Sequence, residues 1–90
     1  MKIYQSRTFE KKIKKFSQQE KGILDEEVKK IVDNHLIGEE KKGDLRGVYI
    51  HKFKIKSIQY LLSYRMIKAG LELIMIGPHE NYYRETSKAI

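Results

Sequence analysis

The chain contains no cysteine, only one proline, and no apolar run that approaches the ~20 residues of a membrane span. Without cysteine there can be no disulfide, no thiol nucleophile and no thiolate metal site, which agrees with a reducing cytosol. The charged start, Met1-Lys2-Ile3-Tyr4, does not have the form of a signal peptide. Histidines occur only at positions 35, 51 and 79, too scattered for a metal site. These absences favour a cytoplasmic protein that holds no metal.

Basic residues dominate the second half of the chain. The formal charge is +7, from 19 basic and 12 acidic residues, and nine of the twelve acids lie between Glu10 and Asp44. From Leu45 to Leu71 there are six cations and no acid: Arg46, Lys52, Lys54, Lys56, Arg65 and Lys68. A basic surface on a small protein predicts nucleic acid, an acidic protein, or both as partners. The alternative is a solvated basic sheet edge that binds nothing.

The length of ninety residues predicts a single domain. We expect it to begin with a short strand over residues 2–6. Phe9, Ile13 and Phe16 then recur at helical spacing, with lysines between them. This pattern predicts an amphipathic helix over residues 8–16 whose lysines form a solvated face.

A second helix is predicted from residue 17 onward. Ser17-x-x-Glu20 has the form of a capping box, in which each residue satisfies a backbone N–H of the other. Gly38 is the expected stop, because glycine readily ends a helix. A polar loop should follow over residues 39–43.

Three strands are predicted over residues 48–55, 58–67 and 71–76, which are rich in β-branched and aromatic side chains. Gly77-Pro78 should break the last strand, and residues 80–89 can form a final helix. The resulting order is β-α-α-β-β-β-α, with the last three strands antiparallel. This is an α+β fold in which two N-terminal helices cover one face of a twisted antiparallel sheet.

Alternation along residues 58–67 assigns side chains to the two faces of the sheet. One set should form core under the helices: Tyr60, Leu62, Tyr64 and Met66. The other set, together with Lys52 and Lys54, could line an open basic face: Gln59, Leu61, Ser63 and Arg65. An antiparallel sheet permits one face to remain in water.

Four segments spread over nearly the whole chain carry a resemblance to a known family. They are Ile3-Tyr4-x-Ser6 with Phe9-x-x-x-Ile13-x-x-Phe16, Gly43-Asp44-Leu45-Arg46-Gly47 with Tyr49, Tyr60-Leu61-Leu62-Ser63-Tyr64-Arg65, and Gly77-Pro78-His79-Glu80-Asn81-Tyr82-Tyr83. In order and spacing these segments resemble the RelE/ParE superfamily of bacterial type II toxins. The resemblance implies a toxin that arrests growth and is neutralised by a cognate acidic antitoxin.

The superfamily includes ribosome-dependent mRNA endonucleases and inhibitors of DNA gyrase, so the resemblance leaves two functions open. The first implies translation inhibition by cleavage that uses the RNA 2′-OH as nucleophile and needs no metal or cofactor. Its partners would be the ribosome and mRNA. The second is a ParE-like toxin that binds gyrase and has no catalysis. A plain RNA-binding module without toxicity is a third possibility.

For the endonuclease, the resemblance implies a set of catalytic residues. His79 falls on a catalytic histidine and suits the general acid by its class of pKa. Tyr83 falls on an aromatic residue that sits against the cleaved nucleotide. The other implied catalytic residues are Lys52, Lys54, Arg65 and the general base Glu39. The candidate RNA contacts combine residues from the resemblance with others from the basic run and the tyrosine pair: Arg46, Lys52, Lys54, Lys56, Gln59, Arg65 and Tyr82.

One position departs from the ribonuclease pattern. Leu61 stands where those relatives carry an arginine that stabilises the transition state. Arg65, which we place one pleat further along the same face, is the expected substitute. Two alternatives without a catalytic role remain: His79 could be a surface or cap residue, and Tyr82 and Tyr83 could both lie in the core. His51 is expected to be packed or at an edge rather than catalytic.

Overall fold

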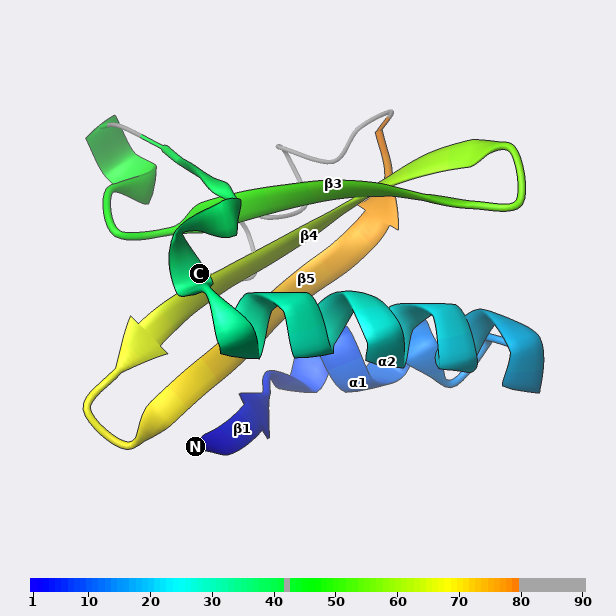
Figure 1. Cartoon of the computed structure of the whole chain (residues 1–90), viewed down its shortest axis with the longest axis horizontal. Helices are drawn as coiled ribbons and strands as arrows, with labels where there is room; N and C mark the ends of the chain where they lie inside the picture. The colour runs from blue at the N-terminus through cyan, green and yellow to red at the C-terminus, as the bar shows by residue number, and fades with distance from the viewer. Residues whose placement is uncertain (42, 80–90) are drawn as a thin grey trace.

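The computed structural model of the chain describes residues 1–41 and 43–79. Figure 1 shows two helices lying against a sheet that the second half of the chain largely builds. In chain order the elements are β1 (Lys2–Gln5), α1 (Arg7–Ile13), α2 (Gln18–Asp33), the 3₁₀ helix η1 (His35–Ile37), β2 (Glu39–Glu40), the 3₁₀ helix η2 (Gly43–Leu45), β3 (Tyr49–Ile55), β4 (Ile58–Ile67) and β5 (Gly70–Pro78). The predicted α+β fold is confirmed. The helix predicted over residues 80–89 lies outside the described residues.

The five strands form one sheet in the order β1-β5-β4-β3-β2. Neighbouring strands from β2 to β5 are antiparallel, as the sequence predicts, whereas β1 runs parallel to β5. The sheet is therefore mixed: the antiparallel arrangement predicted for the last three strands is confirmed, whereas the first strand is parallel to its neighbour. Both helices and three strands separate β1 from β5 in the chain, so no tight turn forces this pair to be antiparallel.

The first helix is fastened to the sheet at its beginning. The Ser6 Oγ accepts a hydrogen bond from the Phe9 N–H at 3.0 Å and donates one to the Ile74 carbonyl at 2.6 Å. This side chain therefore caps α1 and joins it to β5. Helix α1 ends at Ile13, shorter than predicted, and the chain leaves it through a turn in which the Phe16 N–H bonds to the Ile13 carbonyl.

The second helix begins as the sequence predicts. The Ser17 N–H donates to Glu20 Oε1 at 2.7 Å, and the Glu20 N–H donates to Ser17 Oγ at 3.1 Å, so both halves of the capping box form. The helix ends at Asp33 rather than at Gly38, because the Asn34 side chain accepts from the Leu36 N–H and starts η1 instead.

The segment between α2 and the sheet is held by a buried tyrosine. The Tyr64 hydroxyl donates to the His35 carbonyl at 2.6 Å and accepts from the Gly38 N–H at 3.0 Å. A Cβ at position 38 would lie 2.6 Å from this hydroxyl and 3.0 Å from the Ile50 carbonyl oxygen. Gly38 is therefore required for close approach to the sheet. It ends η1 rather than α2.

The main core lies between the two helices and one face of the sheet, which we call the covered face. Its buried members are Phe9, Leu24, Ile31, Phe53, Ile55, Leu62, Tyr64, Leu71, Leu73 and Ile76. Tyr60 and Met66 pack against this core. All four residues that alternation assigned to the core are thus confirmed on the covered face.

An acid–imidazole pair also lies between α2 and the covered face. The His51 Nε2 is 2.7 Å from Glu27 Oε1, and both side chains are nearly buried. Burial disfavours the charged carboxylate, but hydrogen bonds to His51 and Lys30 more than offset it, so the pKa of Glu27 lies below its ordinary value. The His51 ring also stacks on Phe53. The prediction that His51 is packed is confirmed.

The opposite side of the sheet, which we call the outer face, carries a second apolar cluster: Val48, Ile50, Leu61, Ile74 and Met75. Leu61 and Ser63 are both fully buried, so the expectation that they line an open surface is wrong. Both side chains have partners in the sheet. Leu61 belongs to this apolar cluster, and the Ser63 hydroxyl donates to the Met75 carbonyl at 3.3 Å.

Two strand boundaries differ from the prediction. Residues 39–40 are not a loop but the short strand β2, whose register pairs Glu39 with Ile50 and Glu40 with Tyr49. Strand β5 continues through Gly77 and Pro78, since Tyr60 and Leu61 still pair with them. Proline has no backbone N–H, and it is tolerated near a strand end, where the ladder does not need a donor at that position. Over the described ranges, no helix is long and apolar enough to cross a membrane.

Candidate functional site

The predicted cations of β3 lie on the outer face. Along this strand His51, Phe53 and Ile55 are buried toward the helices, while Lys52 and Lys54 are exposed on the other side. Alternation along the strand separates the two sets. Within the described part of the chain, neither lysine forms an ion pair. Their charges are therefore available to a ligand.

Three predicted site residues occupy one row across three strands. Lys54 on β3 pairs with Gln59 on β4, and the His79 N–H donates to the Gln59 carbonyl at 3.2 Å just after β5 ends. All three residues are exposed. Two strand spacings separate the backbones of Lys54 and His79, or roughly 10 Å. The long lysine side chain and the imidazole can both approach a phosphate bound over Gln59.

The next row away from the hairpin turn combines a cation with an apolar side chain. Lys52 pairs with Leu61, which in turn pairs with Gly77. Leu61 is fully buried in the outer-face cluster, so its environment would not accept an arginine without rearrangement. Lys52 and Lys54 stand one pleat, roughly 7 Å, apart along β3.

Arg65 does not join this row. Its Nε lies 2.6 Å from Glu72 Oε1, so its charge is already paired with a carboxylate. It is four residues from Leu61, roughly 13 Å, and the expected spacing of one pleat is wrong. The partner was within reach of sequence reasoning, because a tight turn that pairs Ile67 with Gly70 also places Arg65 opposite Glu72.

Glu39 also lies apart from His79. Glu39 lies on the edge strand β2 and pairs with Ile50 of β3. Ile50 is four residues from Lys54 along β3, or roughly 13 Å. The exposed Glu39 carboxylate is 3.5 Å from Lys41 Nζ. Three strand spacings further separate β2 from β5, so the structure does not bring the predicted base and the predicted acid together.

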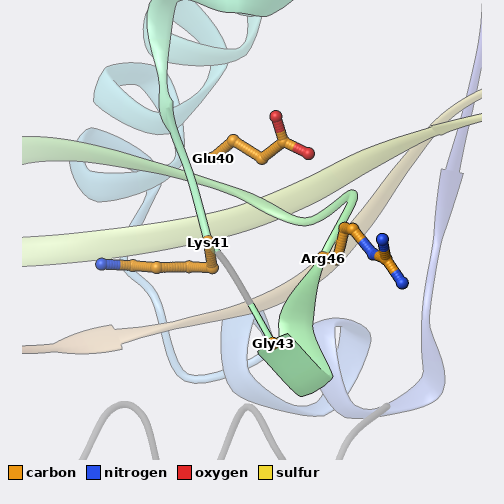
Figure 2. A pocket seen from close by; sticks show the side chains of 4 residues that line it. All are labelled: Glu40, Lys41, Gly43 and Arg46. Atoms are coloured by element: carbon orange, nitrogen blue, oxygen red, sulfur yellow. The ribbon is translucent and has the colours of Figure 1, made fainter.

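Arg46 and Lys56 lie beyond opposite ends of β3. Lys56 is exposed in the β3–β4 turn with a left-handed backbone (φ 58°), two residues beyond Lys54. Arg46 borders a hollow of about 540 Å³ beside η2, together with Glu40, Lys41 and Gly43. Figure 2 shows the Lys41 and Arg46 side chains extending in different directions. They do not converge on a single anion.

The described residues thus bring together Lys54, Gln59 and His79, with Lys52 beside them, and leave Arg65, Glu39 and Arg46 elsewhere. Tyr82 and Tyr83 lie outside the described residues. Among residues 1–41 and 43–79, no group of three or more His, Cys, Asp or Glu side chains could hold a metal ion. The row and the neighbouring Lys52 together offer two cations, an amide and an imidazole, which can bind a phosphodiester and transfer a proton.

A comparison with protein families agrees with the fold and extends over almost the entire chain. Residues 3–87 match the model of the ParE-like toxin of type II bacterial toxin-antitoxin systems. No curated protein matches the chain at a significant level. The family match covers both helices, the sheet and the row at Lys54, Gln59 and His79. The chain belongs to the ParE-like toxin family of type II bacterial toxin-antitoxin systems.

Proposed function

We propose that this toxin is a ribosome-dependent mRNA endonuclease whose reaction centre is the row Lys54–Gln59–His79 on the outer face. The observation that carries the proposal is the register that aligns an exposed imidazole with an exposed, unpaired lysine across β4. Cations near a phosphodiester stabilise the negative charge that develops on its oxygens during cleavage. An imidazole beside them can protonate the leaving oxygen.

The reaction needs only groups that the RNA and this row supply. The 2′-oxygen forms a bond to phosphorus, and the bond from phosphorus to the 5′-oxygen breaks. His79 gives its proton to the 5′-oxygen, and the proton of the 2′-hydroxyl passes to water. Among the described carboxylates, Glu72 is paired with Arg65 and Glu39 lies at the far edge of the sheet. With so few acid and base groups, the ribosome is expected to orient the RNA.

Induced expression in bacterial cells tests the proposal. The toxin should arrest growth, and primer extension on a reporter mRNA should show new 5′ ends within seconds to minutes. His79→Ala and Lys54→Ala should remove these ends, while Lys68→Ala, which deletes an exposed cation at the β4–β5 turn, should leave them. Growth arrest with an intact mRNA would refute cleavage.

Inhibition of DNA gyrase is the second candidate. It is favoured by the burial of Leu61 at the position where ribonuclease relatives carry an arginine, and by the pairing of Arg65 with Glu72. Both features leave the outer face with fewer free cations than a complete nuclease site. A supercoiling assay with purified gyrase separates the candidates, because a nuclease leaves supercoiling unchanged and a gyrase inhibitor leaves mRNA intact.

A further inference from the structure

The N-terminal segment carries a second group of cations, separate from those on the outer face. Residues 2–21 contain two acids and seven cations: Lys2, Arg7, Lys11, Lys12, Lys14, Lys15 and Lys21. In the described structure, Arg7, Lys11 and Lys14 form no ion pair. On α2, in contrast, Lys29 and Lys30 are paired with Glu26 and Glu27 at 3.3 and 3.0 Å. The charges of these three α1 side chains are not neutralised within the described part of the protein.

Helix geometry gathers three of these cations into one row. At 100° per residue, Arg7, Lys11 and Lys14 fall within an arc of about 60°. This arc lies opposite the side of α1 that buries Phe9 and packs Ile13 against the core. All three cations are exposed. Seven residues at ~1.5 Å each make the row roughly 10 Å long.

This row lies on the other side of the molecule from Lys52 and Lys54. Phe9 of α1 packs on the covered face, whereas the two lysines stand on the outer face. The sheet and the core under the helices therefore lie between the two basic surfaces. An RNA segment bound at His79 would have to bend around the sheet to reach α1.

We propose that Arg7, Lys11 and Lys14 form a second contact that binds the phosphate backbone of RNA away from the cleaved segment. A row of ~10 Å spans about three phosphates along one strand of a duplex. The row presents no apolar side chain, whereas an acidic peptide that folds on binding needs apolar surface to bury. The apolar hollow beside α1 lies on the side of Phe9 and Ile13, away from the row. The inference deepens the proposed nuclease function, on which it rests for RNA as the target.

Binding of RNA probes tests the row without any cleavage. The protein carries His79→Ala throughout, and its affinity for a short RNA duplex and for a single strand of adenylates is measured over a range of salt. Lys11→Ala/Lys14→Ala is compared with Lys29→Ala/Lys68→Ala, which removes the same charge from exposed lysines elsewhere. Lys11→Arg/Lys14→Arg keeps the charge on α1.

The row variant should weaken binding on the order of tenfold at moderate salt and reduce the salt slope by about two, while the control changes it little and the arginine variant restores it. A loss seen with the duplex identifies folded RNA as the source of the phosphates, and a loss confined to the single strand identifies an unpaired segment. Equal losses in both double-alanine variants would overturn the proposal, since only net charge would matter. So would unchanged RNA binding with weakened antitoxin binding, which would assign the row to a protein partner.

Because the probes are never cut, the binding result stands whether or not the wild-type protein cleaves mRNA. An absence of mRNA cleavage by the wild-type protein, which retains His79, would refute the proposed nuclease. An absence of any effect of Lys11 and Lys14 on RNA affinity would refute only the second contact. The two failures are therefore distinguishable.

Discussion

The polar residues on the two faces of the sheet differ in whether they have partners, although residues of both faces alternate along the same strands. On the covered face, the Tyr64 hydroxyl makes two backbone hydrogen bonds and His51 is bonded to Glu27. On the outer face, Lys52 and Lys54 have no ionic partner among the described residues. No buried side-chain nitrogen or oxygen in the described ranges lacks a hydrogen bond. The contrast shows that the polar groups under the helices are satisfied within the fold, whereas the charges of Lys52 and Lys54 are not.

The outer face is nevertheless not a uniformly wet surface. Its apolar cluster lies among the lysines, and Leu61 is buried directly opposite Lys52. A change at Leu61 therefore tests packing, and a change at Lys54 or His79 tests chemistry. The predictions below use this division.

The largest effect is expected when charge is placed in the outer-face cluster. Leu61→Arg would bury a guanidinium among apolar side chains, so we expect a loss of several kcal/mol in the free energy of unfolding. Leu61→Met keeps the volume and should cost less than about 1.5 kcal/mol. Urea denaturation followed by circular dichroism measures both. If the arginine variant is as stable as the methionine variant, this part of the outer face is open.

A smaller effect is expected on the covered face from Tyr64→Phe. The change removes a donor to the His35 carbonyl and an acceptor for the Gly38 N–H, at a cost of roughly 1–3 kcal/mol in unfolding free energy. Tyr49→Phe is the matched control, because the ring of Tyr49 stacks on Tyr64 but its hydroxyl has no hydrogen bond in the described structure. Equal stability of the two variants would show that the hydroxyl does not anchor η1.

The pair at Glu27 should make stability depend on pH in the acid range. The folded-state pKa of Glu27 lies below the ordinary value of 4.5, so its contribution is present above that value and is lost as pH falls through the folded pKa. Glu27→Gln removes the titration and should flatten the fall in melting temperature below pH 4.5. An unchanged acid profile would mean that the His51 contact does not favour the carboxylate.

The smallest stability effect is expected from the lysines of the outer face. Because Lys52 and Lys54 are exposed and unpaired, Lys52→Ala and Lys54→Ala should each change the free energy of unfolding by less than about 0.5 kcal/mol. Thermal melts of both variants measure it. A loss as large as that of Tyr64→Phe would show that these cations support the fold and would remove the contrast between the faces.

Much of the fold could be predicted because it depends on local patterns. The capping box at Ser17, the bounds of β4 and the core role of Tyr64 all follow from short-range rules of spacing and alternation. The parallel pairing of β1 with β5 could not be predicted in the same way, since it joins residues far apart in sequence. The predicted end of α2 at Gly38 is wrong, because the Asn34 side chain accepts from the Leu36 N–H and starts η1 directly after Asp33.

The candidate site could be predicted only in part, for a related reason. Sequence parity placed Lys52 and Lys54 on one face, but alternation does not reveal whether a face is covered, as Leu61 and Ser63 show. The pairing of Arg65 with Glu72, in contrast, follows from the register that the tight β4–β5 turn sets and could have been predicted. The alignment of His79 with Lys54 required the register of three strands at once.

The central claim is that the outer-face row at His79 performs chemistry and does not maintain the fold. The most direct measurement compares His79→Ala with the wild type by mRNA cleavage in a ribosome-containing translation extract and by melting temperature. Removal of a general acid should lower the cleavage rate by at least about a hundredfold. The melting temperature should be unchanged, because His79 is exposed and only its backbone N–H bonds to the sheet. Cleavage at the wild-type rate, or a fall in melting temperature that parallels the loss of cleavage, would contradict the account.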